Sequence, residues 1–281
     1  MRAWSVRLVV VSLAACGGGG GAGGDDTNNG GTDGPKPTDD APKPTHHGLI
    51  DIQSYDAMNA PGTPTRGGQA TAAFFAMGDY CTTTQVIGPC NVLACASGFP
   101  PGVSAGTVTL TGAAQPITLM PDPDKTYPAA PSTTPLFSGG ETITYAATGA
   151  DVPAFSGTLV MPSRATITSP PKPAAAATLE VPRSQDFHVT WSGGGSGQVQ
   201  IGLFGSGTDP QRLICYFDAS AGGGSVPTAA LAMLAAGSGG FAMATTAFTE
   251  VDEGDWAVQL GAYFNAVWPD LAIVSGGATF R

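Results

Sequence analysis

The sequence predicts an all-β protein in which two antiparallel β-sandwich units follow a disordered tether, with one short helix near residues 228–236. Two observations favour strands. Apolar and polar residues alternate over many short segments, and clusters of glycine, proline, aspartate and serine interrupt them. The segments with this pattern are 107–111, 141–145, 156–161, 165–168, 187–191, 198–204, 212–217 and 256–260. A less regular segment, 70–77, is also assigned to a strand.

The expected helix has the sequence TAALAMLAA and follows Pro227. Thr228 can cap its first turn, and Gly237 can end it because glycine accepts the left-handed backbone after a helix. A domain boundary is expected in the proline-rich segment 169–173 (SPPKP), which is stiff and prone to turns. The two predicted units are therefore 49–168, which contains a cysteine cluster, and 174–281.

Residues 1–15 have the layout of a secretory signal peptide, with Arg2 and Arg7 before the apolar stretch LVVVSL and then two alanines. This apolar stretch is shorter than the ~20 residues that cross a bilayer. Leu13-Ala14-Ala15-Cys16 resembles the lipobox of bacterial lipoproteins. The resemblance implies cleavage before Cys16 and attachment of acyl chains such as palmitate there. Cys16 is then the membrane anchor, since two or more chains hold a protein firmly on lipid.

The residue after the lipidation position is Gly17. In bacterial lipoproteins an aspartate there favours the inner membrane, so its absence implies an outer-membrane lipoprotein of the cell envelope, facing either the periplasm or the cell surface. Residues 16–48 are rich in glycine, aspartate and proline and have almost no large apolar side chains. We expect them to form a disordered tether, because nothing offsets the entropy cost of ordering them.

Charge is scarce and mainly negative. Only 11% of the residues are charged, with 11 Lys and Arg against 21 Asp and Glu. Removing a signal peptide that contains Arg2 and Arg7 leaves 9 basic residues and a formal charge of −12. This balance argues against nucleic acid as a partner, because nucleic acid requires basic patches. We expect contact with the membrane through the lipid anchor.

Several segments of the second unit follow one known pattern. They are 179–182 (LEVP), 186–191 (DFHVTW), 199–203, Val226-Pro227 with the helical turn after it, and Gly254-Asp255-Trp256 before a late strand. An early strand that ends in tryptophan, a Gly-Ser turn and another strand resemble immunoglobulin-like and fibronectin-III-like bacterial surface modules. The resemblance implies a β-sandwich without an active site in this part of the chain.

Four cysteines follow Cys16, and an exported chain favours disulfides between them. If Ile87-Gly88-Pro89 is a three-residue turn, Cys81 faces Cys95, and Cys90 is free to meet Cys215. The alternatives are Cys81–Cys90 with Cys95–Cys215, or an unpaired, buried Cys215. The spacing of these cysteines is not that of a zinc site, and no metal or other cofactor is predicted.

One motif points to catalysis. Residues 102–106 (GVSAG) match the G-x-S-x-G of serine hydrolases, with Ser104 as nucleophile and His188 as the only base outside the tether. That motif needs a strand before it and a helix after it, whereas two prolines precede this one and a predicted strand follows. A serine hydrolase is therefore the alternative function and not the main one.

Two other groups could bind a ligand. The acidic residues of 250–255 (EVDEGD) could hold calcium on a turn, which makes a calcium-stabilised module a further alternative, although their spacing is not that of an EF-hand. Tyr263, Phe264 and Trp268 could form an exposed aromatic patch for a sugar or a protein. The preferred function is a non-catalytic envelope protein that is structural, adhesive or binds a cell-surface protein or glycan.

Overall fold

A computed structural model of the chain describes residues 45–59, 63–75, 81–95, 101–174, 177–206 and 211–281. The predicted signal peptide, Cys16 and the tether up to residue 44 lie outside these ranges. Strand β1 (His46–Asn59) begins at His46, so residues 46–48, which the tether prediction includes, belong to a sheet. The backbone N–H groups of Thr45 and His46 donate to the Asp255 carbonyl at 3.0 and 3.1 Å, and the His46 ring stacks on Trp256.

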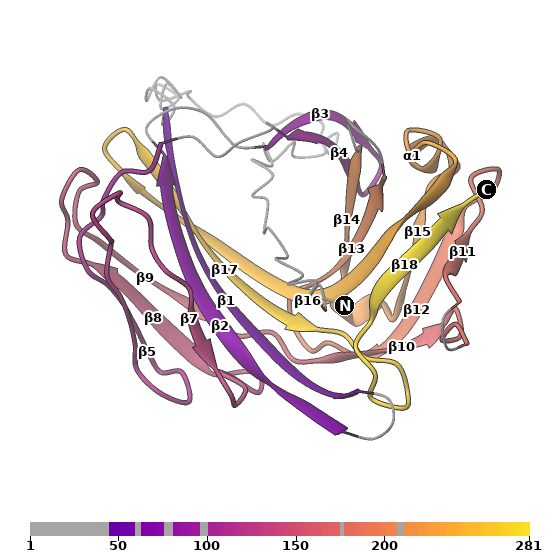
Figure 1. The fold of residues 1–281 in the computed structure, drawn as a ribbon, viewed down its shortest axis with the longest axis horizontal. Helices are drawn as coiled ribbons and strands as arrows, with labels where there is room; N and C mark the ends of the chain where they lie inside the picture. The colour runs from indigo at the N-terminus through magenta and orange to yellow at the C-terminus, as the bar shows by residue number, and fades with distance from the viewer. Residues whose placement is uncertain (1–44, 60–62, 76–80, 96–100, 175–176, 207–210) are drawn as a thin grey trace, which may run out of the picture.

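An 11-stranded sheet forms the centre of the molecule (Figure 1). Nine of its strands follow one path, and they are β3 (Cys81–Ile87), β4 (Cys90–Cys95), β14 (Arg212–Asp218), β13 (Gln198–Gly205), β16 (Gly237–Glu253), β17 (Trp256–Asn265), β1, β2 (Thr63–Phe75) and β7 (Ala130–Ser132). The remaining two extend it beside β16, and they are β18 (Ser275–Phe280) and β11 (Leu179–Val181). Most neighbours are antiparallel, but β1 with β17 and β11 with β18 are parallel pairs.

Two smaller antiparallel sheets complete the fold. The four-stranded sheet contains β6 (Ile117–Leu119), β5 (Val108–Thr111), β8 (Thr142–Ala147) and β9 (Phe155–Val160). The three-stranded sheet contains β10 (Ala165–Ser169), β12 (Phe187–Gly193) and β15 (Gly223–Val226). The all-β prediction is confirmed, and each predicted strand lies within or largely overlaps an observed one.

The helix prediction is correct in position and wrong in length. Helix α1 covers only Thr228–Leu231, and Gly237 already begins β16. The N-cap position is Pro227 and not Thr228. The Asp186 carboxylate accepts hydrogen bonds from both the backbone N–H and the hydroxyl of Thr228, at 2.8 and 2.7 Å, and so caps the turn from another segment. These bonds hold the pKa of Asp186 below its usual range. The other helical element among the described residues is η1 (Ala219–Ala221), a single turn of 3-10 helix.

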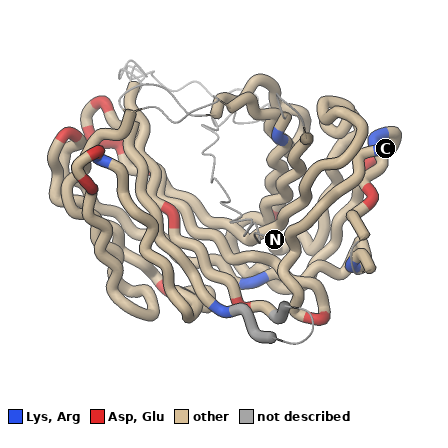
Figure 2. The backbone as a smooth tube through the Cα atoms, viewed as in Figure 1, with Lys and Arg blue, Asp and Glu red and all other residues tan. Residues whose placement is uncertain are grey.

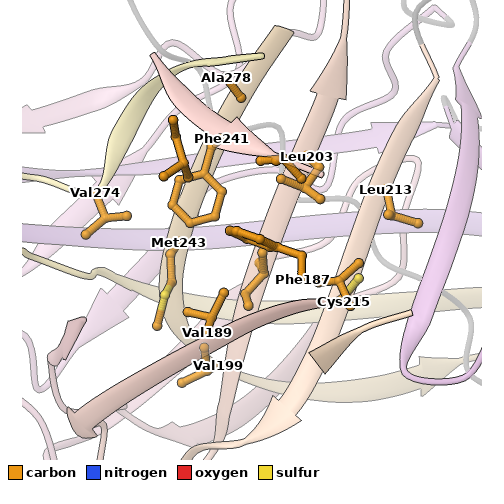
Figure 3. Close-up of a cluster of buried hydrophobic side chains, with 14 of the residues drawn as sticks. Phe187, Val189, Val199, Leu203, Leu213, Cys215, Phe241, Met243, Val274 and Ala278 are labelled. Atoms are coloured by element: carbon orange, nitrogen blue, oxygen red, sulfur yellow. The ribbon is translucent and has the colours of Figure 1, made fainter. Parts of the chain in front are cut away.

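Two hydrophobic cores lie between the large sheet and the smaller sheets. The four-strand core packs the four-stranded sheet against β1, β2 and β17, through residues such as Ile50, Phe74, Leu110, Tyr145 and Leu260. The three-strand core packs the three-stranded sheet against β13, β14, β16 and β18. Figure 3 shows part of this second core, including Phe187, Val199, Leu203, Phe241 and Met243.

The two cores do not follow the predicted division of the chain at 169–173. The four-strand core includes β17 residues of the predicted second unit, and the three-strand core includes Cys90 and Val92 of the predicted first unit. Strand β16 contributes to both, with Met243 in the three-strand core and Val251 packed on the four-strand core. The large sheet therefore joins the two predicted units into one continuous structure.

The cysteines form two disulfides, Cys81–Cys95 and Cys90–Cys215, which match the preferred pairing. The predicted turn is wrong by one residue, because Ile87 pairs with Cys90 and only Gly88 and Pro89 make the turn. A register shift between Thr83 and Gln85 then places Cys81 opposite Cys95 again. Cys90 and Cys215 face each other on the adjacent strands β4 and β14.

Candidate functional site

Both smaller sheets lie on the same face of the large sheet. Met243 and Val251 lie an even number of residues apart on β16, so their side chains point to the same face, and each packs on one of the two cores. The large sheet curves in Figure 1, and the smaller sheets lie against its outer surface. We call the other surface of the large sheet, which faces away from the two smaller sheets, the inner face. Its principal side chains are Asp51, Gln53, Gln69, Gln200, Phe204, Tyr216, Phe248, Gln259, Tyr263 and Asn265.

Carboxamide side chains form a row across the inner face. Gln69 Nε2 donates to Gln53 Oε1 at 3.2 Å, and Gln53 Nε2 donates to Asn265 Oδ1 at 2.8 Å. The three residues come from β2, β1 and β17, which are neighbours in the sheet. All three are half-buried. Because each carboxamide carries both donors and an acceptor, this row offers both kinds of hydrogen-bonding group to a ligand.

Aromatic rings form a second row on the same face. The Tyr216 and Phe248 ring centroids lie 6.1 Å apart, and those of Phe248 and Tyr263 lie 5.4 Å apart, both edge to face. These rings come from β14, β16 and β17. Tyr263 is buried, whereas Tyr216 and Phe248 are half-buried. The inner face thus combines amide groups with aromatic surface.

The carboxylate of Asp51 lies on the inner face among these groups. Asp51 is 8% exposed and lies opposite Gly261 in the register of β1 with β17. A Cβ atom at residue 261 would overlap Asp51 Oδ1, so the glycine leaves room for the carboxylate in its observed position. Burial raises the pKa of the Tyr216 hydroxyl above its usual range, and the Asp51 carboxylate raises it further. Tyr216 therefore stays neutral over the physiological pH range.

A small cleft lies over the paired strands β13 and β16 on the inner face. The residues that line it are Gln200, Gly202, Phe204, Ala242, Met243, Ala244, Asn265, Val274 and Ser275. The Phe204 ring lies over Gly202, where an added Cβ would be 2.6 Å from its Cζ atom. Gln200 is 7% exposed, and its Oε1 atom has no hydrogen-bond partner within the part of the chain that the structure describes. The cleft therefore contains a half-buried ring and an acceptor without a donor.

No protein-family model matches the sequence, and no curated protein matches it. One solved structure with some likeness is "Bacteroides ovatus mixed-linkage glucan utilization locus (MLGUL) SGBP-B in complex with mixed-linkage heptasaccharide". The two chains are 11% identical, and the match covers 85% of this chain and 61% of that one with a TM-score of 0.18. At that TM-score the likeness supports no conclusion about function.

The aromatic patch predicted from Tyr263, Phe264 and Trp268 is wrong as an exposed surface, because the three residues are 2%, 4% and 5% exposed. Tyr263 and Phe264 are consecutive on β17, so they point to opposite faces. Phe264 packs edge to face on Phe137 in the four-strand core, and Trp268 belongs to the three-strand core. Only Tyr263 belongs to the inner face.

Ser104 and His188 are not brought together. Ser104 precedes the four-stranded sheet, and His188 is exposed on β12 of the three-stranded sheet, opposite Ser225. In Figure 1 these two sheets lie at different ends of the molecule. Ser104 Oγ accepts a hydrogen bond from the Gly106 N–H at 3.0 Å, and Gly106 has a φ of 74°, which favours glycine. The geometry of this loop accounts for the G-x-S-x-G pattern.

The acidic residues of 250–255 do not converge on one point. Glu250, Asp252 and Glu253 end strand β16, and the chain then turns directly into β17. Alternation along the strand places Glu250 and Asp252 on one face and Glu253 on the other. Within the described ranges, no group of three or more His, Cys, Asp or Glu side chains is placed to hold a metal ion.

In those same ranges, no helix has the length and apolar composition needed to cross a bilayer.

A local pattern in the sequence indicates part of the inner face. Residues 49–53 (LIDIQ) alternate, with Ile50 and Ile52 in the four-strand core and Asp51 and Gln53 on the other face. Such a pattern predicts that one face of a strand is polar. It does not indicate that β1 lies beside β17, more than 200 residues away, because pairing between distant strands leaves no local signal.

Proposed function

We propose that this chain is a lipid-anchored protein of the cell envelope that binds a glycan on its inner face, without catalysis. The observation that carries the proposal is the composition of that face. Half-buried carboxamide groups lie beside aromatic rings on one continuous sheet surface. Figure 2 shows that charged residues are few and scattered over the molecule.

The chemistry of sugars fits this composition. A sugar ring has apolar C–H faces and a rim of hydroxyl groups, each of which can donate and accept a hydrogen bond. Aromatic rings provide apolar surface for the C–H faces, and carboxamides can pair with neighbouring hydroxyls. Gln53, Gln69 and Asn265 already form a chain of hydrogen bonds, so their side chains are ordered before a ligand arrives. Such preorganisation lowers the entropy cost of binding.

Binding is tested with the soluble chain 17–281 and a panel of polysaccharides. We expect the wild-type protein to bind at least one member, measured by affinity electrophoresis and calorimetry. Replacing Gln53 and Asn265 together by alanine removes two carboxamides and is expected to weaken that binding about tenfold or more. The matched control is Gln85→Ala with Gln115→Ala, since both of these glutamines are exposed and lie outside the inner face. Equal affinity of the two double variants would contradict the proposal.

The anchor is tested separately. The lipobox-like sequence that ends at Cys16 supports lipidation, and Cys16→Ser removes the sulfur that would carry the lipid. We expect the wild-type protein to incorporate an alkyne-labelled palmitate in a bacterial host and to fractionate with membranes. The variant is expected to lose the label and to leave the membrane fraction. Wild-type protein with an unmodified thiol at Cys16, shown by mass spectrometry, would contradict the anchor and leave glycan binding to be judged on its own.

A further inference from the structure

We infer that the cleft over β13 and β16 is a subsite for one residue of an uncharged sugar chain, in which Gln200 Oε1 accepts a hydrogen bond from a ligand hydroxyl and Phe204 stacks on the sugar ring. This inference rests on the proposed function and assigns to it a place and a ligand class. Three separate features of the cleft support it.

The first feature is the acceptor. Gln200 is more than nine-tenths buried and lines the cleft, yet its Oε1 atom has no donor in any described segment. A buried acceptor without a donor costs stability, because it has lost its hydrogen bonds to water. A ligand hydroxyl is a donor of the right kind, and it would supply the missing bond.

The second feature is the apolar platform. Phe204 is half-buried, and its ring is held over Gly202, with Ala242 and Ala244 on the adjacent strand. Small residues beside a ring leave space for a flat ligand to approach its face. Asn265 and Ser275 also line the cleft and supply further polar groups. A ring with amide and hydroxyl groups around it matches a sugar better than it matches a wholly apolar ligand.

The third feature is the charge around the cleft. None of the residues that line it is charged. The charged residue Arg212 lies opposite Phe204 in the register of β13 with β14, but it is not among the lining residues. An anionic sugar would find no cation among the lining residues to pair with its carboxylate. The cleft therefore favours neutral sugars over uronic acids.

Gln200→Met tests the acceptor, because methionine has a similar length and is apolar. The probes are dextran, galactomannan and a soluble β-glucan as neutral polysaccharides, and alginate and polygalacturonate as acidic ones. We expect the variant to bind the best neutral probe about tenfold more weakly. We also expect the unliganded variant to melt a few degrees higher, because the unpaired buried acceptor is gone. The control is Gln198→Met, the same change on the same strand at an exposed position.

Phe204→Leu is the second variant, since it removes the ring and leaves Gln200 intact. We expect it to weaken binding as well, while its melting temperature stays close to that of the wild type. If the wild type binds no probe, the proposed function is contradicted, and the subsite with it. If the wild type binds and both variants bind within about twofold of it, the subsite is contradicted and the function stands. Tighter binding of the acidic probes than of the neutral ones would overturn the assigned ligand class.

Discussion

Replacing Cys90 and Cys215 together by alanine is expected to lower the free energy of unfolding by about 5 kcal/mol. The disulfide closes a loop with a sequence separation of 125 residues, and the entropy that a crosslink removes from the unfolded chain grows with the length of the loop. Both cysteines are fully buried in the three-strand core, so the loss of their sulfur atoms adds a packing cost. Equilibrium unfolding in urea measures the difference by linear extrapolation.

The matched control is the double replacement of Cys81 and Cys95 by alanine. This disulfide has a sequence separation of only 14, so the expected loss is smaller, about 3 kcal/mol. It joins two strands of one hairpin, whereas Cys90–Cys215 joins segments from the two halves of the chain. Equal losses for the two double variants would contradict the assignment of the larger effect to loop length.

Phe74→Ala is expected to lower the free energy of unfolding by about 3–5 kcal/mol. Phe74 is 1% exposed in the four-strand core. Its ring contacts Tyr127 at 5.6 Å, Phe155 at 6.0 Å and Trp256 at 6.5 Å between centroids. These partners come from a loop, from β9 and from β17, so the cavity would weaken the contact between the four-stranded sheet and the large sheet. Urea unfolding followed by tryptophan fluorescence measures the loss.

Phe75→Ala provides the comparison, because it is the same substitution at the next residue. Phe75 is half-buried, and alternation along β2 directs it to the face opposite that of Phe74. A loss of about 1 kcal/mol is expected there. A loss at residue 75 as large as that at residue 74 would show that the face assignment of β2 is wrong.

Local patterns in the sequence were enough to predict the short strands. Segments such as 187–191 and 212–217 alternate clearly, and both are strands that pack on the three-strand core. The two longest strands were missed. Strand β16 (Gly237–Glu253) begins with a glycine-rich, turn-like sequence, and β1 begins with histidines at the end of a low-complexity segment. Their stability as strands comes from the neighbours on both sides, which propensity does not describe.

The candidate site was less accessible to prediction than the fold. An aromatic residue in a sequence can belong to a core or to a binding surface, and the choice depends on which face of a strand it occupies. Phe264 and Trp268 are in the two cores, whereas Phe204 and Phe248 lie on the inner face, although no local pattern marks them as ligand-binding residues. That face is assembled from strands at both ends of the chain, so its composition emerges only from the topology of the sheet.

The position of β1 has a mechanical consequence. The strand starts at His46 and lies between β17 and β2, with residues 47–59 paired to β2 and residues 46–54 paired to β17. A tensile force applied through Thr45 acts along the axis of β1, so the ladder hydrogen bonds to both neighbours are loaded in shear and resist together. The same force at a peripheral hairpin would break its bonds one after another. A molecule that is held from its N-terminal side is therefore held through β1, a strand that resists being pulled out of the sheet.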